Sequence, residues 1–170
     1  MAALGNGIGT KGVWKARCFD PEGNLKWEDG WDNIVVDEGL DYALGATLTG
    51  ATQTTTWYVG LTDGTPTTAG GDTMSSHAGW TEVTAYSEAD RQTWTAGSVA
   101  SQTVDNSGSP ATFTGDTNGT TVGGAFLVSD NTKGGTSGTL FSVGAFQAGD
   151  KTLDNGDTLE VTAEYSNNSL

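Results

Sequence analysis

The run Thr158-Leu-Glu-Val-Thr-Ala-Glu-Tyr165 decides the fold class, because apolar and polar side chains alternate through its whole length. In an extended chain, successive side chains point to opposite faces. The apolar residues of this run therefore share one face: Leu159, Val161, Ala163 and Tyr165. A period of two predicts a strand with one buried and one solvated face, as antiparallel sheets have.

Short runs of the same kind follow one another along the rest of the chain. Residues 13–19 alternate, with Trp14, Ala16 and Cys18 on the more apolar face, and a Pro- and Gly-containing turn leads to a returning strand at 25–29. Further strands are predicted at 57–61, 81–87, 92–98, 101–104, 111–114, 121–128 and 139–146. This spacing predicts an all-β protein, an antiparallel β-sandwich of jelly-roll-like or immunoglobulin-like order with long loops.

Residues 37–48 carry a helical pattern, in contrast to the strands around them. Apolar residues recur at i, i+3, i+4 and i+8: Leu40, Ala43, Leu44 and Leu48. Asp37 is expected to be the N-cap. We therefore expect one short helix, packed across one end of a sheet.

The chain of 170 residues is expected to form one domain. Residues 1–11 are small, Gly-rich and without periodicity, which predicts a flexible N-terminal arm, and residues 12–170 are expected to form a single β-sandwich domain. The start of the chain has neither the basic residues nor the apolar stretch of a signal peptide. No run approaches the roughly 20 apolar residues of a membrane span. We expect a protein made and kept soluble in the cytoplasm.

Net charge is −14 and unevenly distributed. Residues 1–33 hold Lys11, Lys15, Arg17 and Lys26 against five acids, whereas the remainder holds three basic side chains against sixteen acids. A surface this acidic repels phosphate backbones and anionic lipid, so neither a nucleic acid nor a membrane is an expected partner. The near-neutral N-terminal part is the predicted contact with a protein partner.

Side chains for catalysis are scarce. His77 is the single histidine and Cys18 the single thiol. A nucleophilic triad needs a positioned base, and His77 has only its near neighbours Ser75 and Ser76 beside it. We interpret His77 as a histidine that orders a long loop, and Cys18 as a buried thiol on the apolar face of a strand. No catalytic residue, disulfide or cofactor is predicted.

Many carboxylates lie in turns, next to Gly or Asn, where Asp side chains commonly bond their own backbone. They are Asp63, Asp72, Asp116, Asp130, Asp150, Asp154 and Asp157. Residues 150–157 are rich in oxygen ligands but lack the spacing of a helix–loop–helix calcium site. No metal site is predicted, and an irregular loop calcium site stays an alternative.

Four of the six tryptophans fall into two groups. Trp14 and Trp57 lie in strand patterns and are expected in the core. Trp31 and Trp80 lie in polar, loop-like contexts. For these two, core packing and a role as interface anchors are both open, because loop aromatics can cap a core or be exposed to a partner.

A series of motifs follows in a specific order over residues 12–165. In chain order they are Lys26-Trp-Glu-Asp, Asp37-Glu-Gly-Leu, Trp57-Tyr-Val-Gly-Leu61, Gly71-Asp-Thr-Met-Ser-Ser-His-Ala-Gly-Trp-Thr-Glu82, Asp105-Asn-Ser-Gly-Ser-Pro-Ala-Thr-Phe113, Gly124-Ala-Phe-Leu127, Lys133-Gly-Gly, Gly138-Thr-Leu-Phe-Ser142 and Gly156-Asp-Thr-Leu-Glu-Val161. This order resembles a family of small virion-associated proteins of tailed bacteriophages, which we take to be head decoration, or cement, proteins.

The resemblance implies a structural virion protein that binds the outer surface of a phage head and stabilises it. Its implied partners are the major capsid protein and further copies of itself, as a homotrimer, and the family offers no catalytic residues to transfer. Rival functions are a tail-associated or receptor-binding β-sandwich module and a carbohydrate-active hydrolase. The predicted partner-binding residues are Leu4, Ile8, Lys11, Lys15, Arg17, Trp31 and Trp80.

Overall fold

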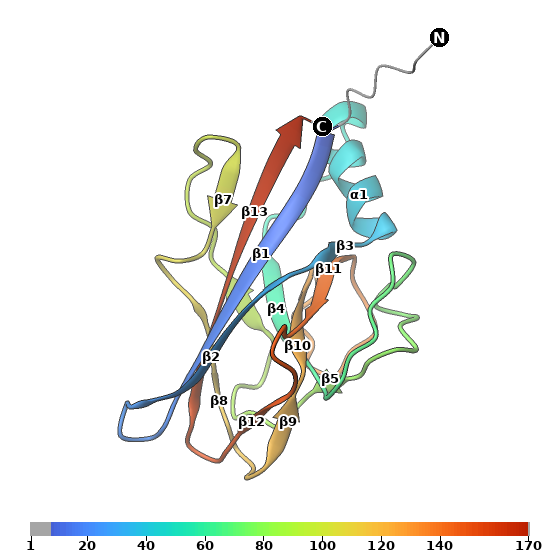
Figure 1. Ribbon diagram of the computed structural model, residues 1–170. Coiled ribbons are helices and arrows are strands. Elements are labelled where there is room, and N and C mark those ends of the chain that lie inside the picture. The colour runs from blue at the N-terminus through green and yellow to red at the C-terminus, as the bar shows by residue number, and fades with distance from the viewer. Residues whose placement is uncertain (1–7, 170) are drawn as a thin grey trace.

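Two antiparallel sheets face each other in the computed structural model, which describes residues 8–169 (Figure 1). The first sheet has the order β2-β1-β13-β7, and β8 also pairs with β13. The second has the order β3-β11-β10-β4-β5, and β6 also pairs with β4. A small separate sheet joins β12 to β9. The expected all-β sandwich with one short helix and long loops is confirmed.

Thirteen strands form these sheets in the described part of the chain. Their bounds are β1 Ile8–Phe19, β2 Leu25–Asp32, β3 Ile34–Val35, β4 Trp57–Thr62, β5 Glu82–Val83, β6 Gln92–Trp94, β7 Thr103–Asp105, β8 Ala111–Thr114, β9 Thr120–Val122, β10 Gly124–Val128, β11 Leu140–Ala145, β12 Lys151–Leu153 and β13 Thr158–Ser169.

The first and last strands pair along their whole length, with Ile8 opposite Ser169 and Phe19 opposite Thr158. The apolar rows predicted for both strands lie on the inner face of this sheet: Trp14, Ala16 and Cys18 on β1, and Leu159, Val161, Ala163 and Tyr165 on β13. All seven are buried. This pairing of the first and last strands provides seven of the buried residues of the core between the sheets.

The second sheet is buried on both faces. Its inner face completes the main core, and its other face packs on a second apolar cluster that includes Met74 and Trp80 from the long 63–81 connection. Within the sheet, Gly60 lies opposite Phe126, and a Cβ at Gly60 would approach the Phe126 ring to 2.2 Å. Only glycine therefore fits at this position of the continuous apolar run of β4.

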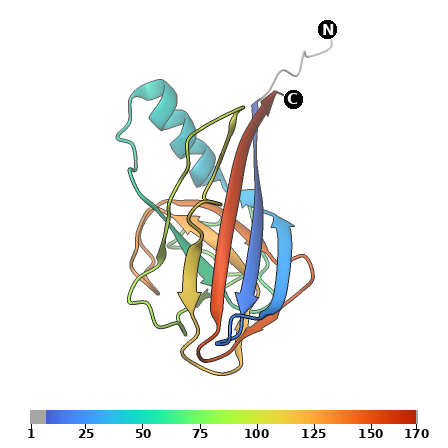
Figure 2. The ribbon, with the colours of Figure 1, turned by 90° about the vertical axis from the view of Figure 1, so that its left-hand side faces the viewer.

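The single helix, α1 (Asp37–Leu44), continues as one wider turn, η1 (Gly45–Thr49), and rises beyond the second sheet at the end of the molecule that β1 and β13 also reach (Figures 1 and 2). It touches the second sheet through Gly39, where a Cβ would lie 2.3 Å from the Phe141 carbonyl oxygen. Its N-cap is Val36 rather than the predicted Asp37. The apolar row that predicted the helix is exposed, namely Leu40, Leu44 and Leu48.

Several predicted boundaries differ from the structure. The predicted arm ended at residue 11, but β1 begins at Ile8, because residues 8–11 pair with the end of β13; residues 1–7 lie outside the described residues. The predicted strand 121–128 is divided at Gly123, whose Cβ would meet the Asp63 carbonyl oxygen at 2.3 Å. The predicted strand 81–87 is reduced to β5, since the chain then turns at Tyr86 and Ser87 to bond the end of β8.

Candidate docking surface

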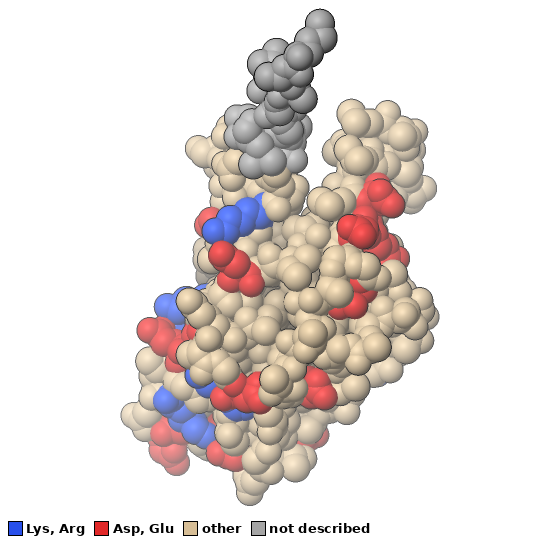
Figure 3. Space-filling view, turned by 45° about the vertical axis from the view of Figure 1, so that its right-hand side comes forward, with Lys and Arg blue, Asp and Glu red and all other residues tan. Residues whose placement is uncertain are grey.

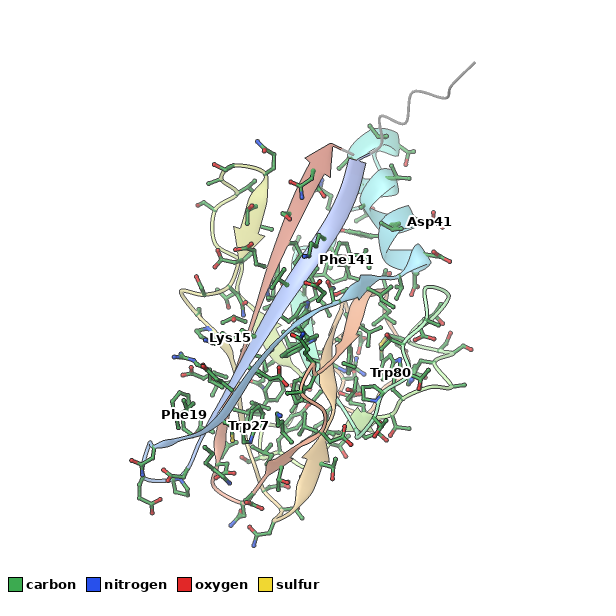
Figure 4. All side chains as sticks on the ribbon, in the orientation of Figure 1. Lys15, Phe19, Trp27, Asp41, Trp80 and Phe141 are labelled. Atoms are coloured by element: carbon green, nitrogen blue, oxygen red, sulfur yellow. The ribbon has the colours of Figure 1, made fainter. Side chains whose placement is uncertain are left out.

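The basic side chains of β1 lie in a row on the outer face of the first sheet, and each is paired with an acid of a neighbouring strand (Figure 4 labels Lys15). Lys11 lies 3.2 Å from Asp32, Lys15 lies 3.0 Å from Glu28, and Arg17 lies 2.7 Å from Glu160. Such exposed pairs contribute at most about 1 kcal/mol each. The acids that neutralise this row come both from residues 1–33 and from the acidic remainder of the chain. The difference in net charge between these two parts of the sequence therefore does not produce one neutral and one acidic face at this sheet.

The two tryptophans proposed as interface anchors are in the core. Trp31 is 3% exposed and lies 4.6 Å, between ring centroids, from Phe146. Trp80 is 4% exposed, and its Nε1–H donates to Asp72 Oδ2 over 3.0 Å. Neither indole offers a surface to a partner, so the packing alternative is the correct one for both. Of the other predicted contact residues, Leu4 lies outside the described residues, and only the backbone of Ile8 is described.

His77 and Cys18 both have structural roles. The His77 ring stacks on Trp80 at 3.8 Å, and its Nδ1 lies 2.9 Å from the Trp80 carbonyl oxygen, which orders the 63–81 connection. Cys18 is fully buried, and this burial, together with the nearby Asp157 carboxylate, raises the pKa of its thiol to about 12. A thiol held in this way is a poor nucleophile at neutral pH.

Three turns meet at one end of the sandwich: residues 20–26, 115–119 and 154–157 (Figure 1). We call this the charged end. The Lys26 ammonium donates to Asp157 Oδ2 over 2.5 Å and to Asp154 Oδ2 over 2.9 Å. Asp154 Oδ1 also accepts the Gly119 N–H over 2.8 Å. The Lys26 hydrogen bond, and then the Gly119 N–H, lower the pKa of Asp154. These carboxylates therefore tie the turns together.

Residues 150–157, which include the last of these turns, are the segment for which the sequence left a loop calcium site as an alternative. In the structure, Asp154 and Asp157 hold an ammonium group, and Asp150 accepts hydrogen bonds from Thr65 on another loop. Across residues 8–169, no three His, Cys, Asp or Glu side chains form a group that could hold a metal ion.

The opposite end of the sandwich is formed by residues 43–56, 95–104 and 165–168, and none of these residues is charged. We call it the uncharged end. It includes η1, the hairpin before β7 and the last residues of β13 (Figures 1 and 2). Large apolar side chains are exposed here: Leu44 is 58% exposed, Leu48 78% and Val99 74%. Exposed apolar side chains of this size at an end without charged residues favour a protein contact surface.

An aromatic cleft opens between α1 and the 95–104 hairpin at this end. Two connected hollows of about 160 and 310 Å³ share Val104, Phe141 and Tyr165. The smaller hollow is lined by Tyr42, Trp57, Trp94 and Leu127 besides these three, and the larger one extends to Thr10, Ala43 and Val99. Ring centroids within the cleft are 5.1–5.8 Å apart, and edge-to-face contacts hold the rings in place.

Figure 3 shows how the two ends differ in charge. Acidic side chains lie at the base of the helix, and acidic and basic side chains are scattered among uncharged ones over the lower part of the surface and up the side of the first sheet, whereas the tip of the helix carries none. Asp37 and Asp41 mark the border, at the base of α1, and Figure 4 shows Asp41 pointing away from the sheets. A notch separates the helix tip from the end of the first sheet in Figure 3, where the cleft opens.

Sequence reasoning did not identify this surface, although it contained a signal. The segments 42–62 and 92–104 lack charged residues in a chain with seven basic and 21 acidic side chains. The helical pattern instead assigned Leu44 and Leu48 to packing, because an apolar row on a helix usually faces a core. The aromatic cleft could not be expected from the sequence, since its residues come from eight separate elements.

Comparisons with protein-family models, with curated proteins and with solved structures found no match for this chain. No helix in the described part of the chain has the length and apolar character needed to cross a bilayer. The assignment of a function therefore depends on the surface itself and on the motif order.

Proposed function

We propose that this protein is a non-catalytic structural protein of a virion, a decoration protein that binds the outer surface of a tailed-phage head and stabilises it. The observation that supports a contact role is the uncharged end, where Leu44, Leu48 and Val99 are exposed on a chain of net charge −14. The motif order directs the proposal to phage heads.

The distribution of charge explains how such a protein would act. Apolar side chains gain from leaving water by roughly 25 cal/mol per Å² of buried surface, and a surface without charges loses no ion hydration on contact. The uncharged end therefore provides the contacts with neighbouring proteins of the shell. The remaining surface is acidic, which keeps the exposed side soluble.

The described part of the chain begins at the same end, because β1 starts at Ile8 beside the last described residues of β13 (Figure 1). The first seven residues also lack charged side chains. We propose that they add to the contact. The deletion that tests this removes residues 2–7 and not the longer arm first predicted, because residues 8–11 belong to the sandwich.

Location is the direct test. Gold-labelled antibody against this protein, imaged on intact particles, is expected to mark the head, and a low-resolution particle reconstruction is expected to show copies distributed over it. Label confined to the tail would contradict the proposal and favour the tail-associated or receptor-binding function. A hydrolase screen with glycan substrates is expected to give no turnover, and turnover abolished by a single carboxylate variant would favour an enzyme.

A further inference from the structure

Five aromatic rings line the smaller hollow of the aromatic cleft, and each contacts the next in the order Tyr42, Trp57, Phe141, Tyr165 and Trp94 (Figure 4 labels Phe141). Neighbouring rings in this series stand at 63–84° to one another. Trp57 and Trp94 lie opposite each other on β4 and β6, which closes the series. Rings at such angles form walls and not a flat stack. We call these five residues the aromatic cage.

The cage has no cation of its own among the described residues. Three rings outside it each lie within 5.4 Å of a cationic side chain, namely Phe19, Tyr86 and Phe126. The negative face of a ring attracts a positive charge in this position. No Lys or Arg of the described residues lies over a cage ring in this way. Segments 42–62 and 92–104, which carry three of the five rings, contain no basic residue.

The charge of the whole chain favours a cationic ligand over an anionic one. A net charge of −14 creates a negative potential that raises the local concentration of cations. Two acids, Asp41 and Asp105, directly adjoin residues that line the cleft. The one basic side chain adjoining a lining residue is Lys11, and it is paired with Asp32 at 3.2 Å. A positive ligand is therefore not repelled at this site.

The polar atoms of the cage select among cations. The Tyr42 hydroxyl accepts the Thr54 N–H over 2.7 Å, and the Tyr165 hydroxyl lies 2.5 Å from Ser142 Oγ. A primary ammonium has three N–H donors, and it would give up its hydration here for few acceptors. A quaternary ammonium has no N–H to satisfy and presents its charge through methyl groups, so aromatic rings alone can bind it.

We propose that the aromatic cage binds a quaternary ammonium group, the trimethylammonium of a choline-like compound. The smaller hollow of about 160 Å³ is below the roughly 300–1,000 Å³ of pockets for whole drug-sized ligands, and it suits a single compact group. The rest of the ligand extends into the larger hollow, which Gln102 and Ser166 also line. This inference goes beyond the proposed function and does not depend on it, because the contact with a head is assigned to exposed side chains and not to the cage.

A matched pair of ligands tests the role of the positive charge. Choline and 3,3-dimethyl-1-butanol have the same shape, but the second has carbon in place of the charged nitrogen. Each is titrated into isotope-labelled protein and followed by NMR, with sodium chloride exchanged for choline chloride at constant ionic strength. We expect choline to bind with a Kd of about 1 mM or tighter, and the uncharged isostere to bind at least ~10-fold more weakly. The largest shifts are expected at the indole N–H signals of Trp57 and Trp94.

Two variants each remove one ring of the cage while keeping an apolar side chain, Tyr42→Leu and Trp94→Leu. Each is expected to weaken choline binding at least ~5-fold and to change the binding of the isostere less, because only the cation loses an attraction to the ring face. Phe19→Leu removes a ring near the charged end and is the matched control, expected to bind choline as the wild type does. Circular dichroism checks folding. The two cage variants lie in different elements, so one decides the test if the other does not fold.

Three results would overturn the inference. They are an absence of shifts at the cage signals up to about 50 mM choline, an isostere that binds as tightly as choline, or folded Tyr42→Leu and Trp94→Leu variants that bind choline as the wild type does. The second would indicate an apolar pocket that does not select for charge. Head labelling is measured separately, so this inference and the proposed function can fail independently.

Trimethylammonium groups occur on free solutes and on lipid headgroups, and sedimentation with phosphatidylcholine vesicles distinguishes the two sources. Co-sedimentation that excess choline releases would identify a headgroup as the ligand. Choline binding without co-sedimentation would identify a free solute. Both outcomes support the cage as the site, since the recognised group is the same.

Discussion

Charged side chains connect the turns at one end of this sandwich and are absent from the segments that form the other end. At the charged end, Lys26, Asp154 and Asp157 bond one another, and the two carboxylates also bond the backbone of two turns. At the uncharged end, Leu44 and Leu48 are exposed, and no charged side chain lies in the segments that form it. The charged groups thus hold the fold together, whereas the surface available for a partner is the one that lacks them.

The surface that lacks charge is not the one that the charges along the sequence suggested as the contact. The near-neutral residues 1–33 were expected to be the contact surface because they contain Lys11, Lys15 and Arg17. Each of these is neutralised by an acid on an adjacent strand. An absence of charge on two separate segments, rather than a local balance of charges, marks the candidate surface.

The largest expected effect comes from adding charge to the uncharged end. In L44D/L48D, two exposed leucines that we place in the contact become carboxylates, so occupancy of purified heads is expected to fall at least ~100-fold. Thermal stability should stay close to that of the wild type, because both side chains are largely exposed. Quantitative gel densitometry of washed heads measures the occupancy. Undiminished occupancy would show that Leu44 and Leu48 do not take part in the contact with the head.

At the charged end, substitution should affect stability instead of binding. Lys26→Met leaves the buried Asp157 carboxylate without its ammonium partner, and we expect a loss of about 2 kcal/mol in the free energy of unfolding. Urea unfolding followed by tryptophan fluorescence measures this loss. Lys11→Met, which removes an exposed pair with Asp32, is the matched control and should cost less than about 1 kcal/mol.

Acid should weaken the charged end in a defined window. The pKa of Asp154 is lowered in the fold, so its contribution to stability is complete above its ordinary value of 3.8 and is lost as the pH falls through the lowered pKa. Asp154→Asn should therefore be less stable than the wild type at about pH 7, and the difference should shrink as the pH falls below 3.8 and through the lowered pKa.

Urea midpoints across this range measure the difference. Comparing the variant with the wild type at each pH removes the general effect of titrating an acidic protein. Asp116→Asn, in a neighbouring turn, is the control with no expected change. A difference between Asp154→Asn and the wild type that persists in acid would contradict the role given to this carboxylate.

The smallest effect is expected from the basic row of the first sheet. Replacing Lys15 and Arg17 together by alanine should change head occupancy less than ~3-fold, since both side chains are paired within the molecule. Occupancy should also survive about 0.5 M salt, because an uncharged contact is not screened. If the occupancy of washed heads depended strongly on salt, the basic row and not the uncharged end would be the surface that binds the head.

Much of the sandwich could be predicted from local pattern. The alternation in 158–165 predicted the buried row from Leu159 to Tyr165, and the alternation in 13–19 predicted the buried face of β1. Each depends on a period of two, which a single strand displays by itself. The pairing of β1 with β13 could not be predicted, because it joins residues about 150 positions apart and leaves no local trace.

The candidate site was mostly missed, for related reasons. Trp31 and Trp80 have polar neighbours in the chain, yet they are buried by Phe146 and Phe126, which come from distant segments. Leu44 and Leu48 had the period of a core-facing row, but the helix contacts the sheet through Gly39, whose missing side chain allows the close approach. In both cases a tertiary contact overrides the local signal.

Side-chain oxidation by hydroxyl radicals, compared between the dilute free protein and the head-bound protein, tests the central claim most directly. The account predicts that Leu44, Leu48 and Val99 are protected on heads, while Leu25 at the charged end reacts equally in both states. Protection of Leu25, or of Val13 beside the basic row, with Leu44 and Leu48 still reactive, would contradict it.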